Sequence, residues 1–219
     1  MIDTIIFDMD GVLVDSEYTF LRSKTEMLHA EGHLKDESYQ YQFMGTTAEF
    51  MWQTMKDELQ LPRSVAEYIA EMNQRRAEII AKDGVRAISH VQEFVKKLAE
   101  AGFKLGVASS SRKSEIEANL TALGLRSYFA QLVSGEEVIH SKPAPDVFLK
   151  AAELLESKPE NCLVFEDTRN GSKAAKAAGM YCIGFANPQY PIQELVADEI
   201  INDFQEVIVA DLANKNSPS

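Results

Sequence analysis

Two aspartates one residue apart, Asp8 and Asp10, are the side chains of this sequence best placed for chemistry. They follow the apolar run Thr4–Phe7, which predicts a short buried strand. Because residues i and i+2 of an extended chain point the same way, both carboxylates should project together from the end of that strand. Gly11 then permits a sharp turn or a close approach of the backbone to a ligand. Such a pair could hold Mg²⁺, or supply a nucleophile beside a general acid–base group, although an ordinary acidic turn has the same composition.

A second polar stretch consists of Ser109, Ser110, Ser111 and Arg112, and it follows the apolar run Leu105–Ala108. The pattern of the residues after it predicts a helix. Hydroxyl groups beside the free N–H groups of a helix N-terminus could cradle a phosphate. The same residues could equally serve as an ordinary helix cap.

Two more charged features follow predicted strands or precede helices. Lys142 stands before Pro143 at the start of an apolar helical stretch, where a point charge could reach a phosphate or an aspartate carboxylate. Glu166 and Asp167 follow the apolar run Cys162–Phe165 and offer the hard oxygen ligands that Mg²⁺ prefers. Each has an alternative interpretation, a solvated surface lysine in the first case and an acidic helix N-terminus in the second.

Short apolar runs alternate with helical patterns along most of the chain. The predicted strands are Thr4–Phe7, Lys104–Ala108, Gln131–Val133, Cys162–Phe165, Tyr181–Phe185 and Glu199–Ile201. The helices predicted between them are Val91–Ala101, Ser114–Leu123, Ala144–Leu155 and Gly171–Ala178. This order predicts an α/β fold, a doubly wound, Rossmann-like parallel sheet. Ligands of such sheets bind at the carboxyl ends of the strands, so the four polar features should converge there.

Residues 15–83 depart from this alternation. Three helical patterns, Glu17–Ala30, Thr47–Leu59 and Arg63–Ala81, occupy the segment without any strand-like alternation. We therefore expect a catalytic core of residues 1–14 and 84–219 and an all-helical cap of residues 15–83, inserted after the first strand. The tail 214–219 is expected to be disordered.

Composition limits the range of partners. The chain has 219 residues, 45% of them hydrophobic, which is enough for one large domain or a domain with a smaller insert. A formal charge of −12 argues against nucleic acid or an anionic membrane as the main partner. Cys162 and Cys182 both lie in apolar runs and predict buried free thiols. No signal-like segment or apolar stretch of bilayer length stands out, so we expect a cytoplasmic protein, and a monomer is plausible.

Taken together, these features resemble the haloacid dehalogenase superfamily. The matching strings occur in the family's order and span nearly the whole chain: Asp8-Met9-Asp10-Gly11-Val12 with Asp15-Ser16, then Ser109, then Lys142-Pro143, then Glu166-Asp167. The helical insert resembles the cap of the subfamily that holds β-phosphoglucomutase and sugar-phosphate phosphatases. The resemblance implies a Mg²⁺-dependent enzyme acting on a small phosphorylated metabolite.

The resemblance also implies roles for individual residues. Asp8 would be the nucleophile that becomes an aspartyl-phosphate, and Asp10 would protonate the leaving alkoxide and then activate water. Ser109 and Lys142 would hold the transferring phosphoryl group. Mg²⁺ would sit on the Asp8 carboxylate, the Asp10 carbonyl oxygen and Asp167, with Glu166 either a ligand or a group that positions one. We expect the substrate site to include Gly11, Ser110, Ser111, Arg112 and Thr46.

Several functions remain open within this resemblance. Asp10 resembles phosphatases and mutases, because dehalogenases lack an acid–base aspartate at that position. β-Phosphoglucomutases carry a histidine in the first cap helix, where this chain reads Thr19-Phe20-Leu21. They also carry a cap arginine after a glycine, where Gly45-Thr46-Thr47-Ala48-Glu49 has none. We therefore expect a phosphatase, with a phosphosugar mutase as the alternative and a non-catalytic binding or regulatory protein as a third possibility.

The cap offers further candidate residues. Its substrate-facing candidates are Thr19, Phe20, Thr46, Thr47 and Trp52. The competing interpretation places Phe50, Met51, Trp52 and Met55 in the core of the cap. Arg22 and Lys24 are expected on a solvated helix face. The histidines His29, His33, His90 and His140 show no ligand spacing.

Overall fold

The computed structural model describes residues 1–44, 46–191 and 194–215. Two predictions fall partly outside this range, namely the cap glycine at position 45 and the tail 214–219. The chain divides into two compact units. The first, here called the sheet unit, consists of Met1–Asp15 and Val85–Ser219, and the second, the helical unit, is Ser16–Gly84.

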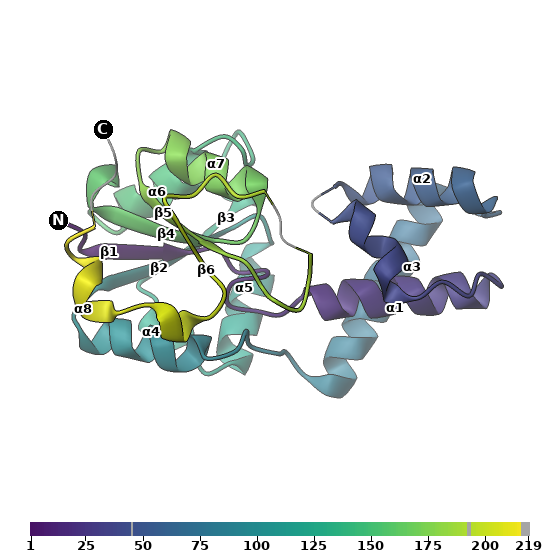
Figure 1. The fold of residues 1–219 in the computed structure, drawn as a ribbon, viewed down its shortest axis with the longest axis horizontal. Helices are drawn as coiled ribbons and strands as arrows, with labels where there is room; N and C mark the ends of the chain where they lie inside the picture. Colours follow the sequence, from purple (N-terminus) through teal and green to yellow (C-terminus); the bar gives the residue numbers. More distant parts are fainter. Residues whose placement is uncertain (45, 192–193, 216–219) are drawn as a thin grey trace. The chain divides into compact units, whose positions relative to one another are not determined.

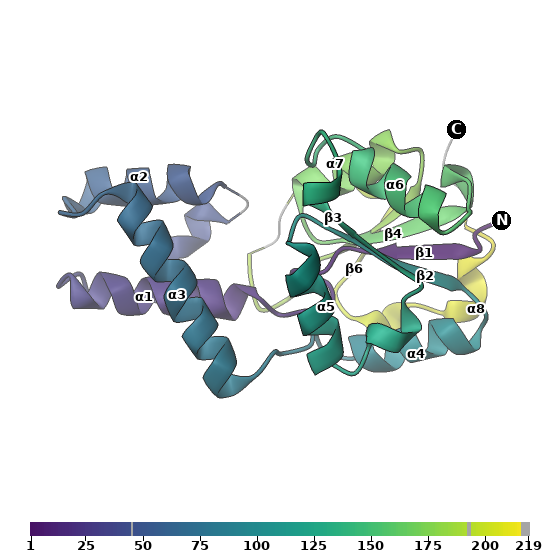
Figure 2. The ribbon, with the colours of Figure 1, turned by 180° about the vertical axis from the view of Figure 1, so that it is seen from behind.

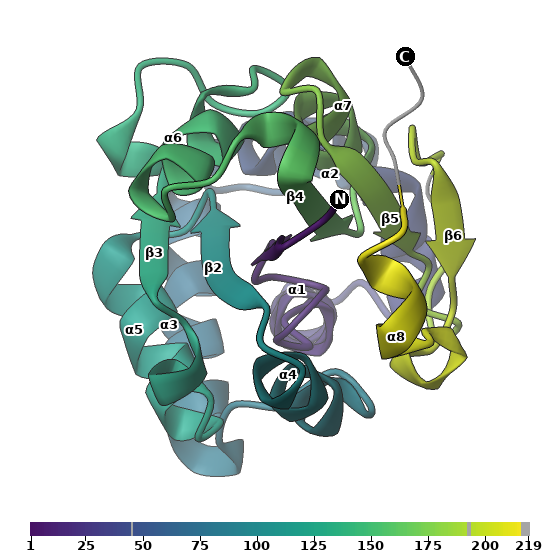
Figure 3. The same cartoon turned by 90° about the vertical axis from the view of Figure 1, so that its left-hand side faces the viewer.

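A six-stranded sheet forms the centre of the sheet unit (Figures 1 and 3). The strands β1 to β6 are Thr4–Phe7, Lys104–Ser109, Gln131–Ser134, Cys162–Glu166, Tyr181–Phe185 and Glu199–Ile201. Their order is β3-β2-β1-β4-β5-β6, and every neighbouring pair is parallel. The strand β1 therefore lies between β2 and β4, where the direction of winding reverses. The predicted doubly wound α/β fold is confirmed.

Helices cover both faces of this sheet (Figure 2). The helices α4 to α8 are Val91–Glu100, Lys113–Ala122, Asp146–Leu154, Arg169–Ala177 and Val209–Leu212. Successive side chains of a strand point to opposite faces, so Ile5 and Phe7 pack with α4 and α5 while Ile6 packs with α6 and α7. The ring of Phe7 stacks on that of Phe165 with centroids 5.0 Å apart. Burial on both faces explains why the strands appear in the sequence as continuous apolar runs.

The helical unit consists of α1, α2 and α3, which are Glu17–Ala30, Ala48–Leu59 and Val65–Asp83, and of a 3₁₀ segment, Glu37–Phe43. Its core contains Met51, Trp52 and Met55 from α2, and the Trp52 ring stacks on Tyr68 with centroids 4.8 Å apart. The core interpretation of these three residues is therefore confirmed. Phe50 was predicted to share the core, and this is wrong, because its place on α2 leaves it 59% exposed.

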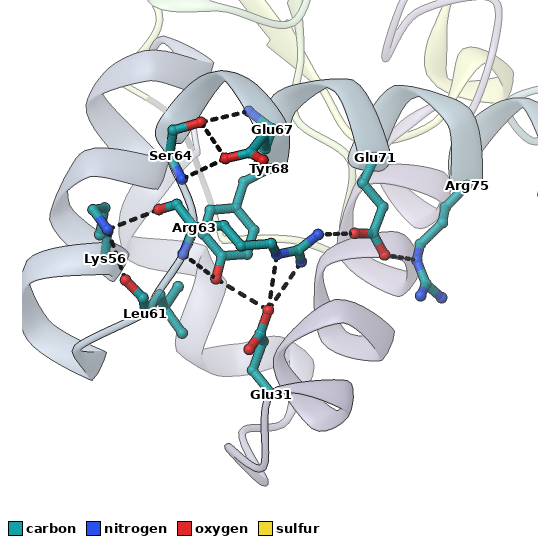
Figure 4. A network of polar contacts seen from close by, with 9 residues as sticks. All are labelled: Glu31, Lys56, Leu61, Arg63, Ser64, Glu67, Tyr68, Glu71 and Arg75. Atoms are coloured by element: carbon teal, nitrogen blue, oxygen red, sulfur yellow. Dashed lines mark hydrogen bonds and ion pairs between the residues drawn. The ribbon is translucent and has the colours of Figure 1, made fainter.

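Polar contacts fix the start of α3 (Figure 4). Ser64 caps the helix, and its N–H and hydroxyl donate to the Glu67 carboxylate at 2.9 and 2.6 Å. The preceding residue, Arg63, forms ion pairs with Glu31 at 3.0 Å and with Glu71. These pairs join the chain after α1 to the first turns of α3.

In the described part of the chain, no helix is both long and apolar enough to cross a membrane.

Candidate active site

The site begins where three neighbouring strands end. Phe7, near the end of β1, lies in register with Val107 of β2 and Phe165 of β4. The next residue, Asp8, donates its main-chain N–H to the Phe165 carbonyl oxygen at 2.9 Å. Continued by one residue, this register places Asp8 level with Glu166, the last residue of β4, and with Ala108, which precedes Ser109 at the end of β2. The expected convergence of polar residues at this edge follows directly from the strand order.

Lys142 is the cation that joins these strand ends. Its Nζ lies 2.6 Å from Asp8 Oδ1 and 2.9 Å from Glu166 Oε1, and it also donates to the Ala108 carbonyl oxygen at 3.2 Å. The side chains are 8% exposed for Lys142, 9% for Asp8 and 1% for Glu166, so water contributes little to their solvation. The Phe148 ring of α6 lies 4.7 Å from Nζ and adds a cation–π contact. The solvated-lysine alternative is excluded by this burial.

Burial sets the protonation of this ion cluster. Desolvation raises the pKa of Asp8 above the usual value for a carboxyl group, and Glu166 and Asp10 raise it further, while Lys142 acts in the opposite direction. Desolvation would lower the pKa of Lys142, but its pairing with Asp8 and Glu166 outweighs that effect and raises it. The lysine is therefore a fixed positive charge. Among the described residues, Lys142 is the one cation that forms ion pairs with Asp8 and Glu166, so a single positive charge faces two carboxylates.

The turn after β1 places Asp10 opposite the second polar stretch. Gly11 adopts φ +78°, and its N–H donates to the Val14 carbonyl oxygen at 2.8 Å. Asp10 Oδ2 accepts a hydrogen bond from the Ser111 hydroxyl at 2.6 Å. A Cβ atom at Gly11 would lie 1.9 Å from Asp167 Oδ2, so the close approach of that carboxylate requires glycine. The turn thus places the Asp167 carboxylate against Gly11, the residue that follows Asp10.

The serine stretch behaves partly as predicted. Ser109 is 1% exposed, and its Oγ accepts a hydrogen bond from the Ser111 main-chain N–H at 3.1 Å. The Ser111 carbonyl oxygen in turn accepts from the Ser134 hydroxyl at 2.7 Å. Ser110 is exposed, and the Arg112 side chain is 72% exposed and forms a 3.8 Å ion pair with Glu136. The geometry therefore connects Ser109 and Ser111 to the carboxylates and shows no such connection for Ser110 or Arg112.

Glu166 holds Lys142 rather than offering a vacant ligand atom. While its Oε1 binds Lys142, its Oε2 accepts from the Thr168 main-chain N–H at 2.7 Å and hydroxyl at 2.9 Å. Gly171 packs so closely that a Cβ there would lie 1.6 Å from Glu166 Oε1. Thr168 and Gly171 were not recognised in the sequence. Thr168 is the N-cap of α7 and Gly171 is the third residue of that helix. This spacing is the feature of the sequence that could have identified them.

The donors present fit a magnesium ion. Within the described residues, no group of three or more His, Cys, Asp or Glu side chains forms a ready metal site. The magnesium ligands expected from the sequence do not make up such a group, because only two of them are side chains. They are the carboxylates of Asp8 and Asp167 and the main-chain carbonyl oxygen of Asp10. Mg²⁺ commonly takes one or two protein carboxylates and completes its shell with water and phosphate oxygens. The glycine cradle of Asp167 and the two carboxylates that face one lysine both suit such an ion.

The predicted cap residues belong to the helical unit. Thr46 is exposed, and its hydroxyl donates to the Phe43 carbonyl oxygen at 2.7 Å. Thr19 is buried and accepts a 3.2 Å hydrogen bond from Arg76 Nε. Lys24 was expected on a solvated face, and this is wrong, because it is only 6% exposed.

Comparison with known proteins shows which family the chain belongs to. A family model described as haloacid dehalogenase-like hydrolase matches residues 5–185. The chain belongs to this family. The match runs from the second residue of β1 to the end of β5 and includes every strand-end residue of the site, so the superfamily predicted from the sequence is confirmed.

Relatives of this haloacid dehalogenase-like hydrolase include named phosphatases. The fructose-1-phosphate phosphatase YqaB of Escherichia coli is 33% identical over 187 residues, which cover 80% of this chain and 92% of that protein. A phosphorylated carbohydrates phosphatase of Thermotoga maritima is 30% identical over 183 residues, covering 81% and 82% respectively. The crystal structure of a family hydrolase from Deinococcus radiodurans, with bound phosphate and sodium, has a TM-score of 0.84 at 25% identity and covers 100% of this chain and 99% of that one. The chain is accordingly a haloacid dehalogenase-type phosphomonoesterase, as predicted.

Proposed function

We propose that this enzyme is a Mg²⁺-dependent phosphatase of small phosphorylated metabolites, with sugar phosphates as the substrate class, and that it works through an aspartyl-phosphate at Asp8. The observation that carries the proposal is the state of the Asp8 carboxylate. Lys142 holds Oδ1 at 2.6 Å, whereas the described residues provide no hydrogen-bond donor to Oδ2. The relatives named for fructose 1-phosphate and phosphorylated carbohydrates support the substrate class.

In the first step, Asp8 Oδ2 attacks the phosphorus atom, and the bond between phosphorus and the ester oxygen breaks. The bonding electron pair leaves with the ester oxygen, which takes a proton from Asp10. Ser111 holds Asp10 Oδ2 at 2.6 Å, so the other oxygen is left to face the leaving group. General acid catalysis of this kind contributes about 10²- to 10⁴-fold to the rate.

In the second step, water attacks the phosphorus of the aspartyl-phosphate, and Asp10 accepts the proton of that water. The bond between phosphorus and Asp8 Oδ2 breaks, which restores the carboxylate and releases inorganic phosphate. Throughout both steps Lys142 keeps its charge, because its pKa lies above the usual value. Its positive charge opposes the repulsion between the Asp8 carboxylate and the phosphate.

The Asp8 and Asp167 carboxylates and the Asp10 carbonyl oxygen would hold Mg²⁺, which when bound neutralises charge on the phosphoryl oxygens. Glu166 takes the positioning role, because both of its oxygens are already occupied by Lys142 and Thr168.

A phosphate-release assay over a panel of sugar phosphates tests the proposal. We expect turnover of at least one member, with fructose 1-phosphate included, that requires Mg²⁺, stops with excess EDTA and is lost in Asp8→Asn. Asp57→Asn is a matched control, because Asp57 is an exposed aspartate of α2. A mutase would instead interconvert phosphate positions without net phosphate release. Release that persists in Asp8→Asn would contradict the mechanism.

A further inference from the structure

Ser134 is a buried polar residue that the proposed mechanism does not use. It is the last residue of β3, is 0% exposed, and pairs in register with Ser109 at the end of β2. Its hydroxyl donates a hydrogen bond to the main-chain carbonyl oxygen of Ser111 at 2.7 Å. The turn after β3 packs closely on the same stretch, because a Cβ atom at Gly135 would lie 3.2 Å from Ser110 Cα. The end of β3 is therefore in direct contact with the serine stretch of the site.

Hydrogen bonds hold Ser111 from two neighbouring strands. Its main-chain N–H donates to Ser109 Oγ at 3.1 Å, and its carbonyl oxygen accepts from the Ser134 hydroxyl at 2.7 Å. Its own hydroxyl donates to Asp10 Oδ2 at 2.6 Å. Both polar groups of the Ser111 main chain are thus fixed by serine hydroxyls, and the fixed main chain sets the direction in which the Ser111 side chain leaves it. Ser134 is in this way linked to Asp10 through one intervening residue.

A second serine of the chain shows what ordinary capping looks like. The Ser134 N–H donates to the Glu137 carboxylate at 2.7 Å, just as the Ser64 N–H donates to the Glu67 carboxylate at 2.9 Å at the start of α3. The Ser64 hydroxyl stays within its motif and donates to Glu67 at 2.6 Å. The Ser134 hydroxyl instead donates to Ser111, from another strand end. A hydroxyl has one proton to donate, so that of Ser134 is committed to the site and not to its own turn.

We propose that Ser134 is a positioning residue for Asp10 and acts through the main chain of Ser111. By fixing the Ser111 carbonyl group, it keeps the Ser111 hydroxyl directed at Asp10 Oδ2. Proton transfer requires the heavy atoms to lie within hydrogen-bond reach, and a misplacement of about 1 Å can cost about 10²-fold in rate. Loss of the Ser134 hydroxyl therefore weakens the alignment of Asp10 with the ester oxygen. This inference rests on the proposed function, because it concerns the proton that Asp10 transfers.

Two aryl phosphates with different leaving groups test this role. p-Nitrophenol is a much stronger acid than phenol, so p-nitrophenolate departs with little help from Asp10, whereas the leaving group of phenyl phosphate needs the proton. The ratio kcat/KM reports the steps up to and including departure of the leaving group. We expect Ser134→Ala to lower kcat/KM for phenyl phosphate by about threefold to tenfold and to change that for p-nitrophenyl phosphate by less than about twofold. Equal losses for the two substrates would overturn the positioning role.

The comparison of two substrates in one protein sample also controls for damage to the fold. A smaller folded fraction lowers both kcat/KM values by the same factor and leaves their quotient unchanged. Ser134→Cys nearly keeps the volume of the side chain but replaces a strong donor by a weak one, so it should change the quotient as Ser134→Ala does. A wild-type quotient in Ser134→Cys would contradict the role of the hydrogen bond. Ser64→Ala removes the matched capping hydroxyl of the helical unit and should leave the quotient unchanged.

A double-mutant cycle tests whether Ser134 acts through Ser111. Ser111→Ala removes the hydroxyl that binds Asp10 and should itself lower kcat/KM selectively for phenyl phosphate. Adding Ser134→Ala to that variant should then change the quotient by less than about twofold, because no Ser111 hydroxyl is left to direct. Selective losses that multiply in the double variant would contradict an action through Ser111.

Failure of this role and failure of the proposed function give different results. Asp8→Asn is measured with the same two substrates. If Asp8→Asn abolishes hydrolysis of both and Ser134→Ala leaves the quotient unchanged, the phosphatase mechanism stands and the role of Ser134 is refuted. Hydrolysis that persists in Asp8→Asn would refute the mechanism itself, and the role of Ser134 with it.

Discussion

Gly171→Ala tests whether the Glu166 carboxylate is held as tightly as the structure indicates. Gly171 lies within the first turn of α7, where helix propensity alone predicts that alanine would stabilise the protein by about 1 kcal/mol. The structure predicts the opposite sign. The new Cβ would lie 1.6 Å from Glu166 Oε1, so the carboxylate would have to retreat by about 1.8 Å to reach an ordinary contact of 3.4 Å.

A displacement of that size breaks the hydrogen bonds that Glu166 accepts from Lys142 and Thr168 at 2.7 to 2.9 Å. Hydrogen bonds to charged groups contribute about 1.5 to 3 kcal/mol each, so losing all three should cost about 4.5 to 9 kcal/mol, or about 3.5 to 8 kcal/mol after the helix gain is subtracted. The assay is urea unfolding of the full-length protein, with phosphate release measured in parallel.

Two further variants isolate the cause. Asn170→Ala changes the exposed neighbouring position of α7 and should be neutral or slightly stabilising. In a Glu166→Ala background there is no carboxylate to displace, so adding Gly171→Ala should cost little. A Gly171→Ala protein as stable as the wild type, or more stable, would refute the reasoning.

Three other changes probe further polar contacts, two in the sheet unit and one in the helical unit. Ser111→Ala frees Asp10 Oδ2, so kcat for phosphate release should fall about tenfold while the urea midpoint stays close to that of the wild type. Lys142→Met leaves Asp8 and Glu166 uncompensated and should cost about 3 to 5 kcal/mol in urea unfolding at pH 7 as well as activity. Lys24→Met should stabilise by up to about 3 kcal/mol at pH 7, because the folded pKa is lowered from 10.5 to about 8. The free-energy cost of burying the charged Lys24 is fully present below pH 8 and decreases as the pH rises towards 10.5. The stability gain of Lys24→Met should therefore be smaller when unfolding is measured at about pH 10. An equal gain at both pH values would contradict the burial of the charge.

The sequence predicts the strands well because each is a short apolar run buried on both faces of a parallel sheet. The position of Asp8 level with Glu166 and one residue short of Ser109 follows from that sheet, since parallel strands end at the same edge. The short helix α8, Val209–Leu212, was not predicted, because four residues are too few to show a helical period. The 3₁₀ segment Glu37–Phe43 was missed for a similar reason, since its hydrogen bonds impose no 3.6-residue pattern.

Other features depend on tertiary packing that a pattern does not encode. Periodicity along α1 does not reveal that the long side chain of Lys24 turns onto the sulfur of Met51 on another helix. The same limit explains Phe50, which is apolar yet exposed beside the buried Met51 and Trp52. The hydrogen bond from Thr168 to Glu166 joins residues that are close in sequence. Its role is visible only in the folded structure, where Lys142, from a loop 24 residues away, donates to the same carboxylate.

The most direct test of the account is phosphate release from p-nitrophenyl phosphate by three purified proteins, the wild type, Asp8→Asn and Asp57→Asn, with Mg²⁺ and then with excess EDTA. We predict Mg²⁺-dependent release by the wild type and by Asp57→Asn, and none above background by Asp8→Asn. Release by Asp8→Asn at a rate comparable to that of the wild type would contradict the central role of Asp8 as the nucleophile.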